Sequence, residues 1–134
     1  MLVLNGWING GYENRHPDIL PAAPQIGCND GLAACSRRVK ALGWLFGLHD
    51  NYQDMYRDAP SWDEGYIIKN PDGSLRKGGV WAGGQCWLIC SREAVALASR
   101  AQNIPQVKEL FAPNARRVGD RPARWNGRDV TMRP

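Results

Sequence analysis

The sequence predicts an α/β protein in which short parallel strands alternate with helices. An apolar run at 2–8 is typical of a buried strand, residues 29–43 have the spacing of an amphipathic helix, and a second apolar run follows at 44–48. This order predicts a right-handed crossover unit of a parallel sheet. With 134 residues, 43% hydrophobic and 22% charged, the chain suits one modest domain. It is too short for a complete eightfold barrel of about 250 residues.

The first half of the chain supplies the crossover unit. After the strand at 2–8, residues 9–27 form a loop with three prolines, and ordered loops of that length tend to be functional. Asn29 or Asp30 is expected to cap the helix, and Gly43 to end it. The apolar stripe of this helix is Leu32, Cys35, Val39 and Leu42.

The second half is expected to begin with a long excursion at 57–90, after the second strand. Within the excursion we expect a strand at 66–69, a turn at 70–73 and a strand at 86–90. Beyond it we expect a helix over about 92–99, capped by Ser91, and another over about 105–111.

Charge divides the chain at residue 112. Residues 1–112 hold 11 basic and 11 acidic side chains, whereas residues 113–134 hold six arginines, no lysine and two aspartates, and so carry the whole net charge of +4. This tail has no Leu, Ile, Phe or Tyr, so it can bury little surface to offset its ordering entropy. We expect 1–112 to fold, 113–134 to be disordered, and everything from about 116 to lie outside the fold. A shifted reading frame and an ordinary flexible basic terminus both fit this composition.

Several classes of function have little support. No apolar run approaches the ~20 residues of a membrane span, and the first four residues lack the basic region of a secretory signal. Gly79 and Gly84 have phosphate-loop spacing, but Gln85 stands where that loop needs lysine. We therefore expect no membrane, no cofactor and no metal. The cysteines have neither a disulfide framework nor good zinc spacing, which predicts free thiols and a cytoplasmic protein: Cys28, Cys35, Cys86 and Cys90.

Polar residues follow both strands of the crossover unit. Asp50 lies just past the second strand, and Glu13, His16 and Asp18 lie in the loop after the first. Parallel strands end at one edge, where chemistry gathers in such folds. Aromatic residues crowd the same loops, and aromatic faces between carboxylates suit a sugar ring. An equally open interpretation is that the acids are solvated and that three aromatic residues belong to the core: Trp7, Trp44 and Trp87.

Four stretches carry a family resemblance: GYENRHPDILPA (11–22), GLHDNY (47–52), KGGVWAGGQ (77–85) and QNIP (102–105). In this order they resemble a largely uncharacterised family of bacterial barrel proteins. That family is itself similar to glycoside hydrolases, distantly to the endo-α-N-acetylgalactosaminidase type. The resemblance covers roughly residues 5–115. It implies a partial (β/α)8 barrel: two to three β/α units with a long βα-loop excursion.

The resemblance implies carbohydrate as the partner and a set of substrate-binding residues: His16, Asp18, His49, Asp50, Asn51, Trp81 and Gln85. Asp50 is the best candidate for a catalytic role. In the family, Pro-Asn-Ala precedes an apolar strand that ends in the expected catalytic aspartate. Here residues 113–115 precede Arg116-Arg117-Val118-Gly119-Asp120 instead.

This departure leads us to expect a fragment of a glycoside hydrolase that supplies the substrate-binding rim and is inactive alone. The first alternative is a non-catalytic carbohydrate-binding or interaction module that uses the aromatic residues alone. The second is nucleic-acid binding through the arginine-rich tail, against which the neutral body of the chain argues.

Overall fold

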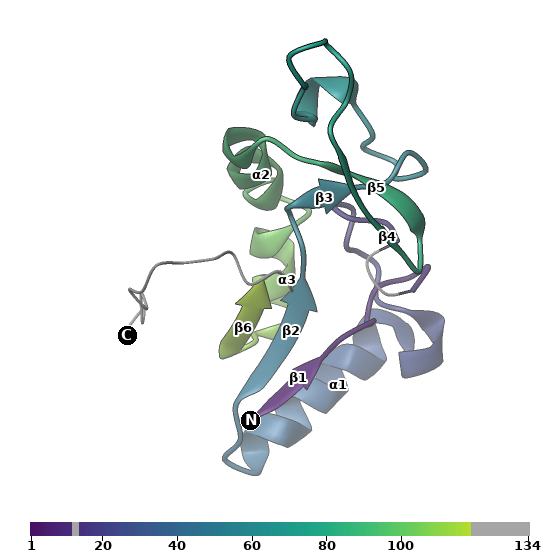
Figure 1. The fold of residues 1–134 in the computed structure, drawn as a ribbon. Coiled ribbons are helices and arrows are strands. Elements are labelled where there is room, and N and C mark those ends of the chain that lie inside the picture. Colours follow the sequence, from purple (N-terminus) through teal and green to yellow (C-terminus); the bar gives the residue numbers. More distant parts are fainter. Residues whose placement is uncertain (12–13, 119–134) are drawn as a thin grey trace.

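A three-stranded parallel sheet forms the base of the molecule (Figure 1). The computed structural model describes residues 1–11 and 14–118, the last three as backbone. The sheet has the order β1 (Leu2–Leu4), β2 (Phe46–Asp50), β6 (Ala115–Val118). Because all three strands are parallel, their C-terminal ends lie at the same edge. Glu13 and residues 119–134 lie outside the described residues.

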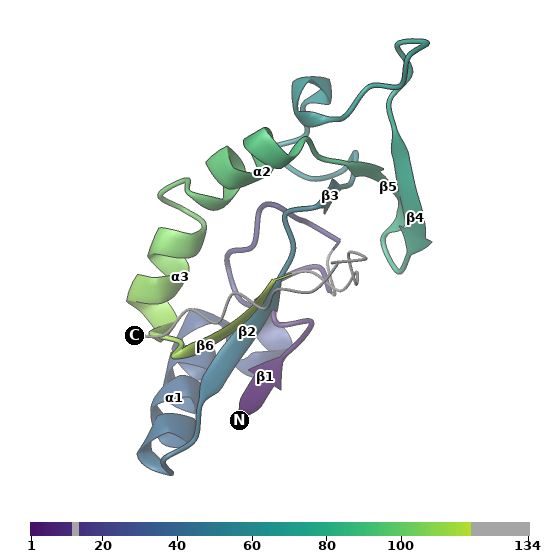
Figure 2. The same cartoon turned by 60° about the vertical axis from the view of Figure 1, so that its left-hand side comes forward.

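Helices connect these strands and cover one face of the sheet (Figures 1 and 2). Helix α1 (Cys28–Ala41) joins β1 to β2, and α2 (Ser91–Ala98) and α3 (Ile104–Phe111) precede β6. Side chains of α1 bond to the end of α3, since Lys40 Nζ donates to the Ala112 carbonyl at 2.8 Å. This alternation gives the α/β pattern that the sequence predicts. No described helix is long and apolar enough to cross a bilayer.

A second, antiparallel sheet lies beyond the C-terminal ends of β1 and β2 (Figure 1). Its order is β3 (Asp54–Met55), β5 (Gly84–Leu88), β4 (Lys77–Trp81). The short 3-10 helix η2 (Glu64–Tyr66) lies between β3 and β4 in the chain. The strand expected at 66–69 is reduced to isolated bridges. The turn expected at 70–73 is confirmed, because the Gly73 N–H donates to the Asn70 carbonyl at 2.9 Å.

The core lies between the parallel sheet and the helices. Trp7 and Phe111 are almost fully buried and meet edge to face, with ring centroids 5.8 Å apart. Phe46 and Leu48 of β2 belong to the same cluster. Of the stripe predicted for α1, Leu32 is buried, and Cys35 and Val39 pack at the margin of the cluster. Leu42 is 74% exposed, because the helix has already ended at Ala41.

Both strands of the crossover unit differ from the sequence prediction at their ends. Gly6 has φ +65° and turns the chain after β1, so Trp7 and Ile8 lie in the loop that follows. Strand β2 begins at Phe46 and continues to Asp50, which is therefore the last strand residue and does not follow the strand.

Helix α1 begins at Cys28, one residue before the expected cap. Gly27, at φ +81°, is the N-cap residue. The Asn29 side chain is engaged elsewhere, because its Oδ1 accepts a hydrogen bond from the Ala22 N–H at 2.9 Å. Helix α2 likewise begins at Ser91, with Cys90 as its N-cap residue.

The boundary expected after residue 112 needs correction, because β6 continues the parallel sheet to Val118. It pairs with β2 from Gly47↔Ala115 to Asp50↔Val118. Strand pairing uses backbone groups, so it tolerates the two arginines that led us to exclude residues from about 116. Asn114 fixes the start of the strand, since its Oδ1 accepts from the Phe46 N–H at 2.7 Å and its own N–H donates to the Phe46 carbonyl at 3.0 Å.

Truncating Phe111 should destabilise the chain strongly. We expect Phe111→Ala to lower the free energy of unfolding by about 3–5 kcal/mol, because it leaves a cavity against Trp7. Val95→Ala, at a position that is 68% exposed on α2, is the control and should change it by less than about 0.5 kcal/mol. Urea denaturation followed by circular dichroism measures both. Equal effects would contradict the assigned core.

Candidate functional site

The loops at the C-terminal edge of the parallel sheet form one continuous rim. We define the rim as the described part of the loop after β1 (residues 5–11 and 14–27), residues 49–52 and the β4–β5 hairpin. The Trp7 Nε1–H donates to the His49 carbonyl at 2.7 Å and ties the first loop to the end of β2. His16 in that loop is fully buried, and its ring lies 6.5 Å from the Tyr52 ring at 90°. The predicted grouping of the first loop with the end of β2 therefore holds in the structure.

Three predicted residues lie in sequence at the end of β2. His49, Asp50 and Asn51 are 2%, 1% and 5% exposed. Successive strand residues face opposite sides of a sheet, so His49 and Asp50 project in different directions. A buried imidazole and a buried carboxyl at one strand end have the chemistry of general acids and bases.

Asp18 accepts hydrogen bonds from two other segments of the chain. Its Oδ2 accepts from the Ser61 N–H at 2.8 Å, and its Oδ1 accepts from the Ser61 hydroxyl at 2.5 Å and from Arg100 Nη2 at 3.2 Å. Arg100 Nη1 also donates to the Ser61 oxygen at 2.7 Å. We call these three residues the Asp18 brace. It joins the first loop, the excursion and the segment after α2.

A second group of buried polar residues lies behind the hairpin. The Asn51 amide donates to Asp54 Oδ1, and the Cys86 Sγ lies 3.1 Å from Asp54 Oδ2. Burial, followed by the contact with Asp54, raises the pKa of the Cys86 thiol from the ordinary 9.0 to about 12. The sequence predicts Cys86 as a buried free thiol, and its burial is confirmed. The sequence gives no sign that Cys86 contacts Asp54, which is 32 residues away.

The β4–β5 hairpin brings Trp81 to the rim. Trp81 is 50% exposed, and its ring lies so close to Gly79 that a Cβ there would come within 2.6 Å of it. The turn rests on the first loop, because a Cβ at Gly83 would lie 2.7 Å from Asn14 Oδ1.

The amide of Gln85 lies inside the same hairpin. Its Nε2 donates to the carbonyls of Gly78, Gly79 and Cys86 at 3.2, 3.2 and 2.8 Å. Gln85 thus holds the two strands together where the sequence predicts a substrate contact.

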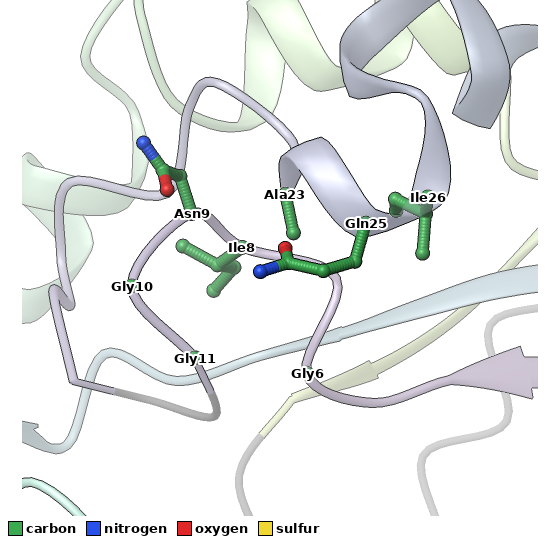
Figure 3. Close-up of a pocket in the computed structure, with 8 residues that line it drawn as sticks. All are labelled: Gly6, Ile8, Asn9, Gly10, Gly11, Ala23, Gln25 and Ile26. Atoms are coloured by element: carbon green, nitrogen blue, oxygen red, sulfur yellow. The ribbon is translucent and has the colours of Figure 1, made fainter.

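A hollow of about 530 Å³ opens where β1 ends (Figure 3). The Asn9 and Gln25 amides and the Ile8 side chain lie around it. None of the seven predicted substrate-binding residues lines this hollow, so it occupies a different part of the first loop from His16 and Asp18. The residues that line the hollow are Gly6, Ile8, Asn9, Gly10, Gly11, Ala23, Gln25 and Ile26.

Metal ligands are not assembled in the described part of the chain. No group of three His, Cys, Asp or Glu side chains there could hold a metal ion. All four cysteines are free thiols.

A parallel α/β sheet with buried polar residues at its C-terminal edge is the arrangement in which α/β enzymes hold their active sites. No protein-family model matches the chain. Solved structures of a glycosidase do match it, which supports a partial α/β domain related to glycoside hydrolases.

One matching enzyme is the α-N-acetylgalactosaminidase NagBb from Bifidobacterium bifidum. Its ligand-free structure is 30% identical with a TM-score of 0.79, over 87% of this chain and 19% of that chain. Its Gal-NHAc-DNJ complex is 30% identical with a TM-score of 0.79, over 87% of this chain and 18% of that chain. Its GalNAc complex is 32% identical with a TM-score of 0.74, over 81% of this chain and 17% of that chain. The chain thus spans about a fifth of that enzyme, consistent with a fragment of a glycoside hydrolase-like protein.

Breaking the Asp18 brace should cost stability. We expect Asp18→Ala and Arg100→Ala each to lower the free energy of unfolding by about 2–3 kcal/mol, and the double variant to lose less than the sum of the two. Arg92→Ala, the control, removes an 89% exposed arginine paired with its neighbour Glu93. It should change the free energy of unfolding by less than about 0.5 kcal/mol. Chemical denaturation measures all four variants. Additive losses would contradict the brace.

Cys86 should make the protein less stable in alkali. Because the pKa of its thiol is raised in the folded state, the folded chain keeps a proton that the unfolded chain loses between pH 9 and 12. Relative to Cys86→Ser, the wild type should therefore lose up to about 1.4 kcal/mol of unfolding free energy per pH unit across that range, and nothing below pH 8. Parallel stability curves for the two proteins would contradict the raised pKa.

Proposed function

We propose that this chain is part of a (β/α)8-barrel glycoside hydrolase that acts on N-acetylgalactosamine-containing carbohydrates, and that it supplies the substrate-binding rim. The observation that carries the proposal is its likeness to NagBb, at 30% identity and a TM-score of 0.79 over 87% of the chain. Solved structures of that enzyme include complexes with GalNAc and with Gal-NHAc-DNJ.

The topology supports a barrel segment. Strands β1, β2 and β6 are parallel neighbours in chain order, with α1 and α3 on one face (Figure 2). This arrangement fits two to three consecutive β/α units of a barrel, of which the second carries the long excursion. The free thiols fit the proposed cytoplasmic location.

The rim residues fall into two roles. The half-exposed Trp81 ring offers a face for the C–H side of a sugar, while His16, His49 and Asn51 place polar groups at the same edge. Asp50 remains the best candidate for a catalytic carboxyl. Glycoside hydrolysis needs two carboxyl groups across the scissile bond, so we propose that the chain alone binds sugar without cleaving it.

A non-catalytic binding module is the second candidate. The observation that favours it is the exposure of Trp81 and Val80, at 50% and 70%, on one hairpin. A module of this kind binds through aromatic faces alone, so replacing Asp50 would leave its affinity unchanged.

Titration with methyl α-N-acetylgalactosaminide, followed by two-dimensional NMR, tests the proposal. We expect binding in roughly the millimolar range, because part of the enclosing wall is missing. Trp81→Ala should abolish binding, and Asp50→Asn should weaken it at least fivefold. Trp44→Ala is the matched control, because this 56% exposed tryptophan precedes β2 at the opposite end of the strand.

Three results would count against the proposal. Equal affinity for methyl β-glucoside would remove the sugar class, and full affinity in Asp50→Asn would favour the binding module. Release of nitrophenol from p-nitrophenyl α-N-acetylgalactosaminide by the chain alone would show that it contains a complete catalytic pair.

A further inference from the structure

A buried carboxylate lies on β3, an edge strand of the second sheet. Asp54 is the first residue of β3 and is 5% exposed. Two neutral donors face it, the Asn51 amide at Oδ1 and the Cys86 thiol at Oδ2. No lysine or arginine in the described ranges pairs with it. A desolvated carboxylate depends on its hydrogen bonds, so both donors are needed to keep Asp54 in place.

The thiol also contacts strand β4 on its other side. Cys86 Sγ lies 3.2 Å from the Gly79 carbonyl, and a Cβ at Gly78 would come within 2.6 Å of the sulfur. The backbone of β4 therefore rests directly on the thiol. Only glycine, which has no side chain, allows the backbone of β4 to come this close to the sulfur.

Trp81 rests on the same backbone. Its indole ring covers Gly79, where a Cβ would lie 2.6 Å from ring carbons. The Trp81 side chain also offsets part of the rise in the pKa of Cys86. The order of contacts is thus carboxylate, thiol, strand backbone and indole.

We propose that Asp54, acting through the Cys86 thiol, is a positioning residue that fixes the Trp81 indole at the rim. The sugar-binding part of this inference rests on the proposed function, whereas the positioning part does not. At neutral pH the thiol is protonated, since its pKa is about 12, and it can donate to the carboxylate. A thiolate beside Asp54 would instead be repelled.

The competing explanation is that Cys86 only fills space. Cys86→Ala removes both volume and donor, whereas Cys86→Ser keeps a donor in a slightly smaller side chain. Asp54→Asn keeps the size but turns an N–H₂ group toward one of its two donors, so one hydrogen bond is lost. Asp72→Asn, in the exposed turn that precedes β4, is the matched control.

The experiment reads Trp81 directly and without sugar. In Cys86→Ala and Asp54→Asn we expect the Trp81 indole N–H resonance to shift and amide hydrogen exchange at residues 78–81 to rise at least tenfold. Affinity for methyl α-N-acetylgalactosaminide should fall at least fivefold. Cys86→Ser should stay within twofold of wild type in exchange and affinity, and Asp72→Asn should match wild type. Circular dichroism melting confirms that each variant is folded.

The outcomes separate the two proposals. An unchanged Trp81 resonance and unchanged exchange in folded Cys86→Ala and Asp54→Asn would overturn the inference. A Cys86→Ser variant that behaves like Cys86→Ala would also overturn it, because the donor would then be irrelevant. If the indole moves as expected but the wild-type protein binds no sugar, the positioning role stands and the proposed function fails.

Discussion

Parallel pairing of β2 with a strand on each side is the constraint on which the remaining structure depends. Each residue of β2 is buried, and its backbone groups serve β1 on one side and β6 on the other. Because the three strands share one direction, every connection returns through a helix on the same face. The loops then emerge at one edge, and the Trp7–His49 hydrogen bond fastens the first of them to the end of β2.

Carboxylates at that edge are stabilised by local hydrogen bonds. Asp18 accepts from a serine and an arginine, and Asp54 accepts from an amide and a thiol. Both carboxylates thereby bind loops together, and both lie beside the residues proposed to meet the sugar. Acidic residues in these loops thus serve two purposes, and only the neighbours of each carboxylate distinguish a brace from a candidate catalyst.

The sequence predicts those features that depend on local pattern. Apolar periodicity finds the strands around Leu4 and Leu48 and the helix that ends at Phe111, and the strand-end rule places Asp50 at the rim. Strand boundaries depend on single backbone angles such as that of Gly6, which periodicity does not report. Amino-acid composition does not predict β6, because the backbone pairing that forms this strand needs no apolar side chains. The contact of Asp54 with Cys86 joins positions 32 residues apart, and no local pattern indicates it.

The edges of the parallel sheet bear on where catalysis is completed. In the described residues β1 and β6 each pair on one side only, and helices cover one face. Parallel sheets are stable when both faces are covered, and a barrel achieves this by closing the sheet on itself. Further strands of a glycosidase would pair with these edges and enclose the uncovered face of the sheet. If the proposed function holds, the second carboxyl for hydrolysis would come from such a strand, because Asp18 and Asp54 already accept internal hydrogen bonds.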